Sequence, residues 1–284
     1  MAKAITLSGV GIETLQFSEI PDAVAGPGEV LIAVEAASIN PVDRGAATAG
    51  YGDKMPGDAP WILGWDLAGT ITGVGTGVDA ALVGRRLLGF SQWFKGGPGL
   101  QRSQVALPLD NIAVVGDAIP SPELTTFGLN GLTALQVLDA AELNAGQSVL
   151  VVGASGGVGG FVAQIAESRG ITVLTAGREN PPLEFAGMEL DGLVNTAPAD
   201  PTSYLVAVRD GGVATSVTTP AEAERGIRSS RVGVKVDRAG LATVARLAEE
   251  GVLTTTVAGT FPAHQPQVAY AADGSSGRIV LIFS

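Results

Sequence analysis

One glycine-rich segment near the middle of the chain constrains its fold more than any other feature. Residues 149–152 are four consecutive apolar residues, which is typical of a buried parallel strand. The turn Gly-Ala-Ser-Gly-Gly-Val-Gly-Gly follows at 153–160, and apolar residues then recur at helical spacing up to Arg169. A strand, a glycine-rich turn and a helix in this order are the context in which glycines indicate a dinucleotide-binding site.

The glycines of this turn have separate physical roles. The pattern is A-x-G-x-x-G, so Ala154 stands where the first glycine is usual, whereas Gly156 and Gly159 are retained. Such glycines allow a tight bend, let the backbone approach a pyrophosphate, and let the helix pack closely on the strand. The N–H groups at the start of the helix would bind phosphate. We therefore expect the nucleotide to contact Ala154, Ser155, Gly156, Gly157, Val158 and Gly159.

The following strand, expected at 171–175, indicates which nucleotide is bound. An NAD site usually has an acidic residue near the end of this strand, where it binds the ribose 2′-hydroxyl. This strand instead continues into Ala176, Gly177 and Arg178. A guanidinium offers a charge-assisted fork to a 2′-phosphate, so we expect NADPH, with Gly177 and Arg178 among its contacts. The alternatives are that Arg178 is a solvated loop charge and that Glu179 takes the NAD role.

Length and hydropathy favour a cytoplasmic enzyme. A chain of 284 residues is long enough for two domains and a sizeable core. Apolar residues make up 46% of it, but no run approaches the ~20 residues needed to cross a membrane. The first residues lack the charged and then apolar pattern of a signal segment. We expect a cytoplasmic location and no membrane partner.

Composition excludes several kinds of chemistry. The chain has no cysteine, which excludes disulfides, thiolate catalysis and cysteine-based metal sites. Its 17 basic and 28 acidic residues give a net charge of −11. A strongly acidic protein is a poor ligand for nucleic acid, so we expect no nucleic-acid partner.

The pattern of predicted secondary structure changes twice along the chain. Up to about residue 118, short alternating runs separated by Gly and Pro predict a small antiparallel barrel. Helices and strands then alternate to about residue 257, with strands expected at 148–152, 171–175, 192–196, 213–218 and 231–236. A helix is expected at 239–250, and the final stretch, 261–284, ends in another strand at 277–283.

Several short motifs together carry a family resemblance. They are Asn40-Pro41-Val42-Asp43, Gly64-Trp65-Asp66, Gly131-Leu132-Thr133-Ala134, the glycine turn, and Gly-Arg-Ile-Val-Leu at 277–281. In this order they resemble the zinc-free quinone oxidoreductases, the zeta-crystallin-like branch of the medium-chain dehydrogenase/reductases. The resemblance implies an α/β protein with a GroES-like antiparallel β-barrel domain at 1–118 and 258–284. A Rossmann domain with a doubly wound parallel sheet would occupy 119–257.

The zinc ligands of related enzymes are missing from this sequence. Zinc-dependent relatives have a Cys-His pair at Asn40-Pro41 and a Gly-His-Glu motif at residues 64–66. A catalytic zinc needs about three protein ligands, and the single histidine, His264, lies in an expected surface loop. We therefore expect no metal.

The Rossmann half is shorter than the resemblance implies. Between Arg178 and Val213 only one strand is evident, near residues 193–195, and the candidate helix at 181–187 is broken by proline. A full half needs another strand and its crossover, so one βα unit is missing. In the family the shortened side lies beside the adenine pocket, so the missing unit bears on adenosine binding and on the usual dimer contacts. A homodimer is still expected.

The resemblance also implies site residues. Tyr51, 11 residues after Asn40, would line the active-site cleft, where a tyrosine hydroxyl can supply a proton or polarise a carbonyl. Asn40 would face the nicotinamide ribose, and Thr133 the phosphate region. Thr196 and Val217 complete the expected cofactor contacts, and Trp65, Trp93 and Phe94 are candidates for an aromatic substrate pocket.

Each of these residues also has an ordinary structural alternative. Tyr51 would pack against Pro56 or Trp61, Asn40 would be a pre-proline turn residue, and Thr133 would bond within its helix. Asp43 is expected to cap the helix that follows it. The three aromatic residues would belong to the core.

The expected function is NADPH-dependent reduction of quinones or activated C=C bonds in a small-molecule substrate. One alternative is a secondary-metabolite reductase that performs enoyl reduction or reductive cyclisation. Another is a nucleotide-binding sensor or scaffold without turnover, which the shortened Rossmann half makes plausible.

Overall fold

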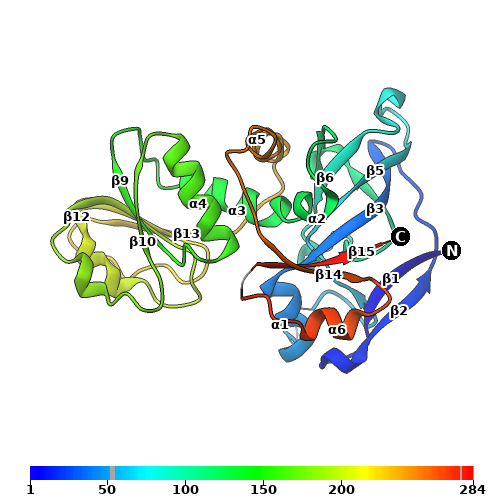
Figure 1. Cartoon of the computed structure of the whole chain (residues 1–284), viewed down its shortest axis with the longest axis horizontal. Helices are drawn as coiled ribbons and strands as arrows, with labels where there is room; N and C mark the ends of the chain where they lie inside the picture. Colours follow the sequence, from blue (N-terminus) through cyan, green and yellow to red (C-terminus); the bar gives the residue numbers. More distant parts are fainter. Residues whose placement is uncertain (52–54, 276, 284) are drawn as a thin grey trace. The chain divides into compact units, whose positions relative to one another are not determined.

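A computed structural model describes residues 1–51, 55–275 and 277–283. The chain forms two compact units (Figure 1). The first comprises Met1–Leu129, Lys235–Glu249 and Thr255–Ser284, and the second comprises Asn130–Val234 and Glu250–Thr254. These boundaries differ from the expected ones because helix α5 (Arg238–Glu249) packs against strand β8 (Ile112–Val115) of the first unit.

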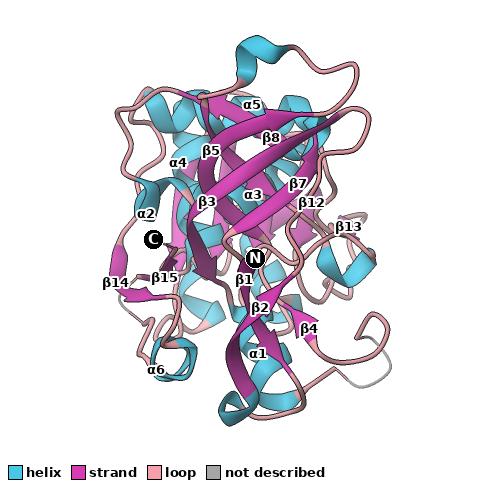
Figure 2. Cartoon of the chain, turned by 90° about the vertical axis from the view of Figure 1, so that its right-hand side faces the viewer, coloured by secondary structure: helices cyan, strands magenta, loops and turns pink. Residues whose placement is uncertain are grey.

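The first unit contains two β-sheets. The smaller has the order β2-β1-β4 and is antiparallel throughout, and the larger has the order β14-β15-β3-β5-β6-β8, with β7 also paired to β3. Figure 2 shows β3 running between β5 and β7, the strands that pair with it on either side. The strands are β1 (Ala2–Leu7), β2 (Leu15–Ile20), β3 (Glu29–Ile39), β4 (Trp61–Ile62), β5 (Asp66–Val74), β6 (Arg86–Phe90), β7 (Gln104–Pro108), β8, β14 (Val257–Pro262) and β15 (Arg278–Ile282). Every pair in the larger sheet is antiparallel except β14 with β15.

The end of the chain returns to the first unit, as the sequence predicted. Strand β15 pairs with β3 in antiparallel register, with Ile279 opposite Ile39. Both strands carry apolar side chains that are buried, including Val280 and Leu281. Burying a side chain of this size stabilises a fold by about 1.5–3 kcal/mol. The pairing therefore helps to stabilise a core formed by residues that are more than two hundred positions apart in the sequence.

Short helices complete the first unit. They are α1 (Pro41–Ala49), α2 (Ser121–Leu124), α5 and α6 (Pro266–Ala271). Helix α1 begins directly after β3 and has Pro41 as its first residue, a position where the missing N–H costs nothing. The 3-10 turn Trp93–Lys95 follows β6 and brings Phe94 against Tyr51, just after α1, and against Trp65, just before β5.

The second unit is built on a parallel sheet with the order β10-β9-β11-β12-β13. Its elements are α3 (Phe127–Asp139) from Asn130 onward, β9 (Ser148–Val152), α4 (Gly157–Ser168), β10 (Thr172–Ala176), β11 (Leu190–Asn195), β12 (Val208–Ser216) and β13 (Arg228–Arg231). Strands β9, β10 and β11 lie within two residues of their predicted bounds, whereas β12 begins five residues and β13 three residues earlier than predicted. The doubly wound parallel sheet of the Rossmann type is thus confirmed.

The expected shortening of this sheet is visible at its β10 edge. Strand β10 pairs only with β9 among the strands that the structure describes. The chain then reaches β11 through the 3-10 segment Pro182–Phe185, and reaches β12 through a second one, Thr202–Ala207. Prolines at the start of the first segment prevent an α-helix from continuing through them. One βα unit is therefore absent between β10 and β11.

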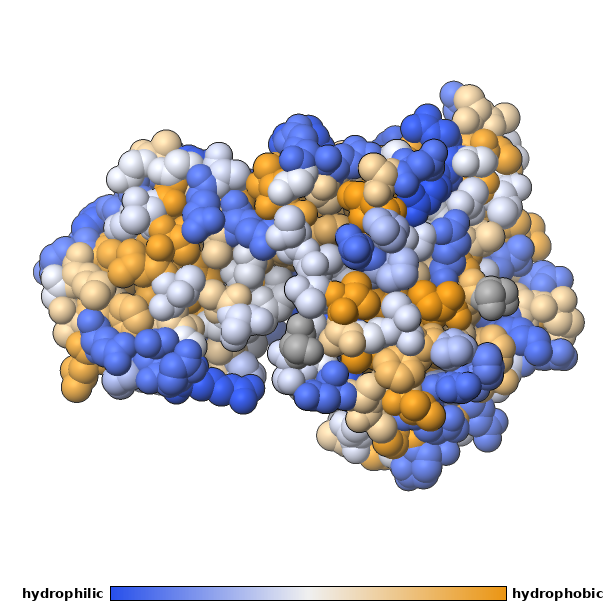
Figure 3. All heavy atoms as spheres, viewed as in Figure 1, coloured by the Kyte–Doolittle hydropathy of each residue, from blue (hydrophilic) through white to orange (hydrophobic). Residues whose placement is uncertain are grey.

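The two 3-10 segments cover one face of the sheet in place of longer helices. Phe185 and Leu205 pack into a core cluster with Leu150 and Leu193. Their neighbours Leu183 and Val206 are 78% and 41% exposed, and Figure 3 shows apolar side chains gathered on the second unit. Thin cover by short segments thus leaves apolar surface on this unit. Among the described residues, none of the helices is long and apolar enough to cross a membrane.

Candidate active site

Most of the predicted cofactor residues meet at one edge of the second unit's sheet. The register places Ala176 and Asn195 beside Val152, and Ser216 beside Asn195, so β9 to β12 end level with one another. The glycine turn, Gly177-Arg178, Thr196 and Val217 are the residues that directly follow these ends. The carboxyl edge of a parallel sheet is where such folds bind ligands, so the sheet gathers these residues at one place.

The tight bend of the turn is made by a glycine that the sequence pattern did not single out. Gly153 has a φ of 87°, in the left-handed region that favours glycine. Its N–H donates to the carbonyl of Ala176 at 2.9 Å, and its own carbonyl accepts the N–H of Gly156 at 3.0 Å. Because Gly153 makes the bend, Ala154 is tolerated at the position where the usual pattern has glycine.

Gly156 and Gly159 face different surroundings. A Cβ on Gly159 would overlap the carbonyl of Gly153 and come within 2.6 Å of the Thr196 hydroxyl, so this glycine allows the helix to pack on the strand. A Cβ on Gly156 would meet only the carbonyl oxygen of Gly153, at 3.3 Å. Gly156 is exposed, and it is the N-cap of α4. A ligand can therefore approach the backbone closely at Gly156.

Thr196 fixes the turn from the neighbouring strand. Its hydroxyl donates to the carbonyls of Val152 at 2.9 Å and Gly153 at 3.2 Å. Its backbone N–H also donates to the Val152 carbonyl, at 2.9 Å. Thr196 thus contacts the turn and holds it in position, whereas the resemblance had given Thr196 a contact with the cofactor.

Asn195 is a structurally important residue that sequence reasoning missed. It is fully buried, and its amide donates to the carbonyls of Ala197 at 3.2 Å and Ala199 at 3.1 Å, and to the Ser216 hydroxyl at 3.1 Å. Val217 donates its N–H to the Asn195 carbonyl at 3.0 Å. Asn195 therefore ties together the loops that follow β11 and β12. A polar residue at the end of an apolar strand was the available signal.

The turn after β10 is held by a side chain that also escaped prediction. The Asn180 side-chain oxygen accepts the N–H of Gly177 at 3.0 Å. Glu179 lies over Gly177, where a Cβ would be 2.5 Å from the carboxylate. Arg178 is exposed and forms no ion pair with any residue in the described part of the chain. Its guanidinium is thus available to an anionic ligand.

Thr133 lies apart from these strand ends in the chain. It is in α3 and is 7% exposed. The same helix packs on the sheet, where the Thr215 hydroxyl donates to the carbonyl of Val137 at 3.0 Å. The role that the resemblance gives Thr133 stays a prediction.

In the first unit, Asn40 belongs to a buried polar cluster. Its amide donates to the Ser38 hydroxyl at 3.0 Å and to both Asp66 carboxylate oxygens at 3.2 Å. Ser38 also donates to Asp66, and all three residues are fully buried. Asn40 is the N-cap of α1, and Asp43 closes the capping box. The expectation that Asp43 itself caps the helix was therefore wrong, because the helix starts two residues earlier, at Pro41.

Asp43 and Asp66 are two buried carboxylates held by N–H groups. Asp43 accepts the N–H groups of Asn40 at 3.0 Å and Gly64 at 2.9 Å, and Asp66 accepts that of Leu129 at 3.2 Å. Burial raises the pKa of Asp43 to about 7, against the lowering effect of these hydrogen bonds. Burial likewise raises the pKa of Asp66 to about 6, although Ser38 and Asn40 lower it.

Tyr51 lies in an aromatic cluster. Its ring meets Phe94 edge-on, with centroids 5.1 Å apart, and Phe94 stacks on Trp93 at 3.9 Å and contacts Trp65 at 5.9 Å. The indole N–H of Trp65 is buried and has no hydrogen-bond partner among the described residues. The predicted aromatic residues thus come together. Tyr51 packs against Phe94, whereas the sequence had suggested Pro56 or Trp61 as its packing partner.

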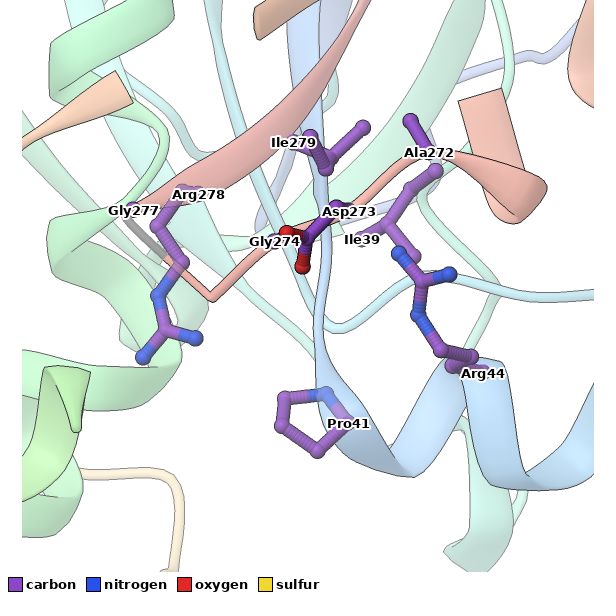
Figure 4. Close-up of a pocket in the computed structure, with 9 residues that line it drawn as sticks. All are labelled: Ile39, Pro41, Arg44, Ala272, Asp273, Gly274, Gly277, Arg278 and Ile279. Carbon is purple, nitrogen blue, oxygen red and sulfur yellow. The ribbon is translucent and has the colours of Figure 1, made fainter. Parts of the chain in front are cut away.

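A pocket of about 290 Å³ opens beside α1 in the same unit (Figure 4). Arg44 and Arg278 lie on its two sides with Asp273 between them. Arg44 donates to the carbonyl of Tyr270, and burial lowers the pKa of Arg278. With two cations and one carboxylate, the lining favours an anionic ligand.

His264 is exposed in a turn after β14, as predicted. Among the described residues, no group of three or more His, Cys, Asp or Glu side chains is arranged to hold a metal ion.

Comparison with known proteins agrees with this architecture. Residues 26–115 match the family described as alcohol dehydrogenase GroES-like domain. A quinone oxidoreductase from Coxiella burnetii superposes with a TM-score of 0.86 at 22% identity, covering 100% of this chain and 99% of that one. The chain has the medium-chain dehydrogenase/reductase fold. An alcohol dehydrogenase superfamily protein from Novosphingobium aromaticivorans also superposes with a TM-score of 0.86, at 23% identity over both whole chains.

Sequence relatives of this chain include quinone oxidoreductases. The rat quinone oxidoreductase is 40% identical over 159 residues, which are 53% of this chain and 45% of that protein. The mouse quinone oxidoreductase is 36% identical over 178 residues, 60% of this chain and 50% of that protein. A zinc-type alcohol dehydrogenase-like protein of Staphylococcus aureus is 30% identical over 167 residues, 55% of this chain and 47% of that protein. The chain thus spans about half the length of the curated relatives it matches.

Proposed function

We propose that this chain is an oxidoreductase that uses NADPH to reduce quinones or activated C=C bonds without zinc. The observation that carries the proposal is the glycine turn at the carboxyl edge of the parallel sheet, where Gly156 is exposed and a Cβ on it would meet only the Gly153 carbonyl oxygen. The quinone oxidoreductases among its relatives support the reaction class.

The turn fits a dinucleotide. The residues that would hold it are the turn residues 154–159, together with Gly177 and Arg178 after β10 and Thr196 and Val217 after β11 and β12. When bound, the nicotinamide supplies the hydride. The protein supplies orientation: backbone N–H groups at the start of α4 bind phosphate, and Thr196 keeps the turn in place through the Val152 and Gly153 carbonyls.

Arg178 supports NADPH over NADH. Its exposed guanidinium would bind a 2′-phosphate by a charge-assisted contact. Glu179, the alternative partner for a ribose hydroxyl, lies beside it, so the two residues can be tested against each other.

Tyr51 is the proposed proton donor, and Asn40 supports it. Reduction of an enone leaves an enolate that needs a proton, and a tyrosine hydroxyl can provide one. Reduction of a quinone leaves a well-stabilised hydroquinone anion, which needs less help. Asn40 contributes by fixing the start of α1, the helix against which Tyr51 rests.

The test is NADPH oxidation by the purified protein against quinones and enones, beside a direct measurement of nucleotide binding. Turnover of several acceptors supports the proposed reductase, and turnover of a single enone favours a tailoring reductase. Tight nucleotide binding without turnover of any acceptor would favour the sensor or scaffold alternative, which the missing βα unit supports.

A further inference from the structure

Gly45 occupies a position where a helix normally avoids glycine. It lies in the middle of α1 (Pro41–Ala49), and its φ is not in the left-handed region. Alanine is favoured over glycine at such a position because glycine loses more conformational entropy on folding. The backbone conformation therefore does not require glycine at residue 45. The reason for a glycine must lie in a neighbouring part of the structure.

The Tyr51 side chain fills the space beside Gly45. A Cβ at residue 45 would overlap the Tyr51 hydroxyl oxygen and lie 3.1 Å from the ring carbon that carries it. The hydroxyl donates to the carbonyl of Val42 at 3.4 Å, and Phe94 meets the ring edge-on at an interplanar angle of 76°. Tyr51 is thus seated between Phe94 and the bare helix surface at Gly45.

This seat also sets the surroundings of the hydroxyl. Asp43, fully buried in the first turn of α1, directly follows the residue whose carbonyl Tyr51 contacts. Burial and then the charge of Asp43 raise the pKa of Tyr51. A hydroxyl displaced from the helix would be more solvated and farther from this carboxylate.

We propose that Gly45 is a positioning residue that seats the Tyr51 hydroxyl against the first turn of α1. The absence of a side chain at residue 45 decides where that hydroxyl lies. The inference rests on the proposed function only in its consequence for activity, since the seating itself is a property of the folded protein.

The test is the variant Gly45→Ala, examined with ¹³C-labelled tyrosine by NMR titration. The chain has three tyrosines, and Tyr51→Phe assigns the resonance of Tyr51. We expect Gly45→Ala to shift the Tyr51 resonance and to lower its pKa towards the ordinary tyrosine value. An unchanged resonance and pKa would overturn the proposal.

Stability gives a second readout that needs no activity. Gly45→Ala should raise the denaturant midpoint more in the Tyr51→Phe background than in the wild type, because the overlap with the hydroxyl is gone. Thr48→Ala is the matched control, since Thr48 is exposed on the same helix, and its effect should be equal in both backgrounds. Equal effects of Gly45→Ala in both backgrounds would contradict the seating.

Activity then separates this proposal from the assigned role of Tyr51. If Tyr51 donates the proton, Gly45→Ala should slow enone reduction by about the factor that Tyr51→Phe does, with unchanged NADPH affinity. A moved Tyr51 resonance with unchanged enone reduction would keep Gly45 as a positioning residue and reject Tyr51 as the proton donor.

Discussion

The side-chain amide of Asn40 donates to both carboxylate oxygens of Asp66, at 3.2 Å each, and both residues are fully buried. Asn40 also begins the helix whose capping box contains Asp43, so one residue connects two buried carboxylates. Burial raises the pKa of both carboxyl groups above the ordinary value of 3.8, to about 7 for Asp43 and about 6 for Asp66.

This cluster predicts a pH dependence of stability. Because the folded pKa values lie above the ordinary value of 3.8, the carboxyl groups favour folding when protonated. This contribution is lost progressively as the pH rises from about 4, up to about 6 for Asp66 and about 7 for Asp43. Each pKa unit corresponds to about 1.4 kcal/mol. We expect the free energy of unfolding to fall as the pH is raised across this window, measured by denaturant titration.

The variant Asp43→Asn tests which group is responsible. Asparagine does not titrate, so Asp43→Asn should make the slope of stability against pH shallower throughout the window and remove it between about pH 6 and 7. Asp66→Asn should make the slope shallower only below about pH 6. Slopes equal to that of the wild type in both variants would show that the buried carboxylates do not titrate as described.

Two glycines of the turn should respond differently to the same substitution. Gly156→Val should abolish nucleotide binding and leave the protein folded, because only the Gly153 carbonyl lies near its Cβ, at 3.3 Å. Gly159→Val should instead lower the melting temperature, because its Cβ would overlap that carbonyl. Calorimetric nucleotide titration and thermal unfolding measure the two effects. Binding by Gly156→Val within severalfold of wild type would place the nucleotide elsewhere.

Arg178 and Glu179 provide a test of cofactor choice. Arg178→Ala should weaken NADPH binding about ten- to a hundredfold, the value of a lost charge-assisted contact of about 1.5–3 kcal/mol, and leave NADH nearly unchanged. Glu179→Gln should alter neither. The measurement is the dissociation constant of each nucleotide for each variant. If Glu179→Gln weakens NADH binding and Arg178→Ala weakens neither nucleotide, the site is assigned to NAD.

Tyr51→Phe should separate the two proposed substrate classes. Enone reduction should slow by about 10²-fold, at the low end of general-acid effects, because the enolate is a strong base. Quinone reduction should change much less. The comparison uses steady-state rates with both acceptors at saturating NADPH, and equally small effects would return Tyr51 to a packing role.

The sequence predicted the elements whose signals are local. The strand at 148–152, the helix after the glycine turn and the final strand were evident because hydrophobic periodicity and turn residues act over a few positions. The missing βα unit was predicted for the same reason, since too few residues separate Arg178 from the next strand.

The contacts between strands could not be predicted in this way. Asn40 meets Asp66 only because β3 and β5 pair in a particular register, and Asn195 reaches Ser216 only because β11 and β12 do. Gly153 was missed because the usual pattern puts the first glycine one residue later. Phe94 was expected either in a substrate pocket or in the core, and its edge-on contact with Tyr51 could not be predicted because it depends on a loop whose path no periodicity describes.

The most direct test of the central claim is NADPH oxidation by the purified wild-type protein with a quinone as acceptor, in the presence of a metal chelator. Gly156→Val serves as the matched control for background oxidation. We predict acceptor-dependent oxidation that the chelator does not diminish and that Gly156→Val lacks. Equal rates for wild type and variant, or loss of the rate on chelation, would contradict a zinc-independent NADPH reductase built on this turn.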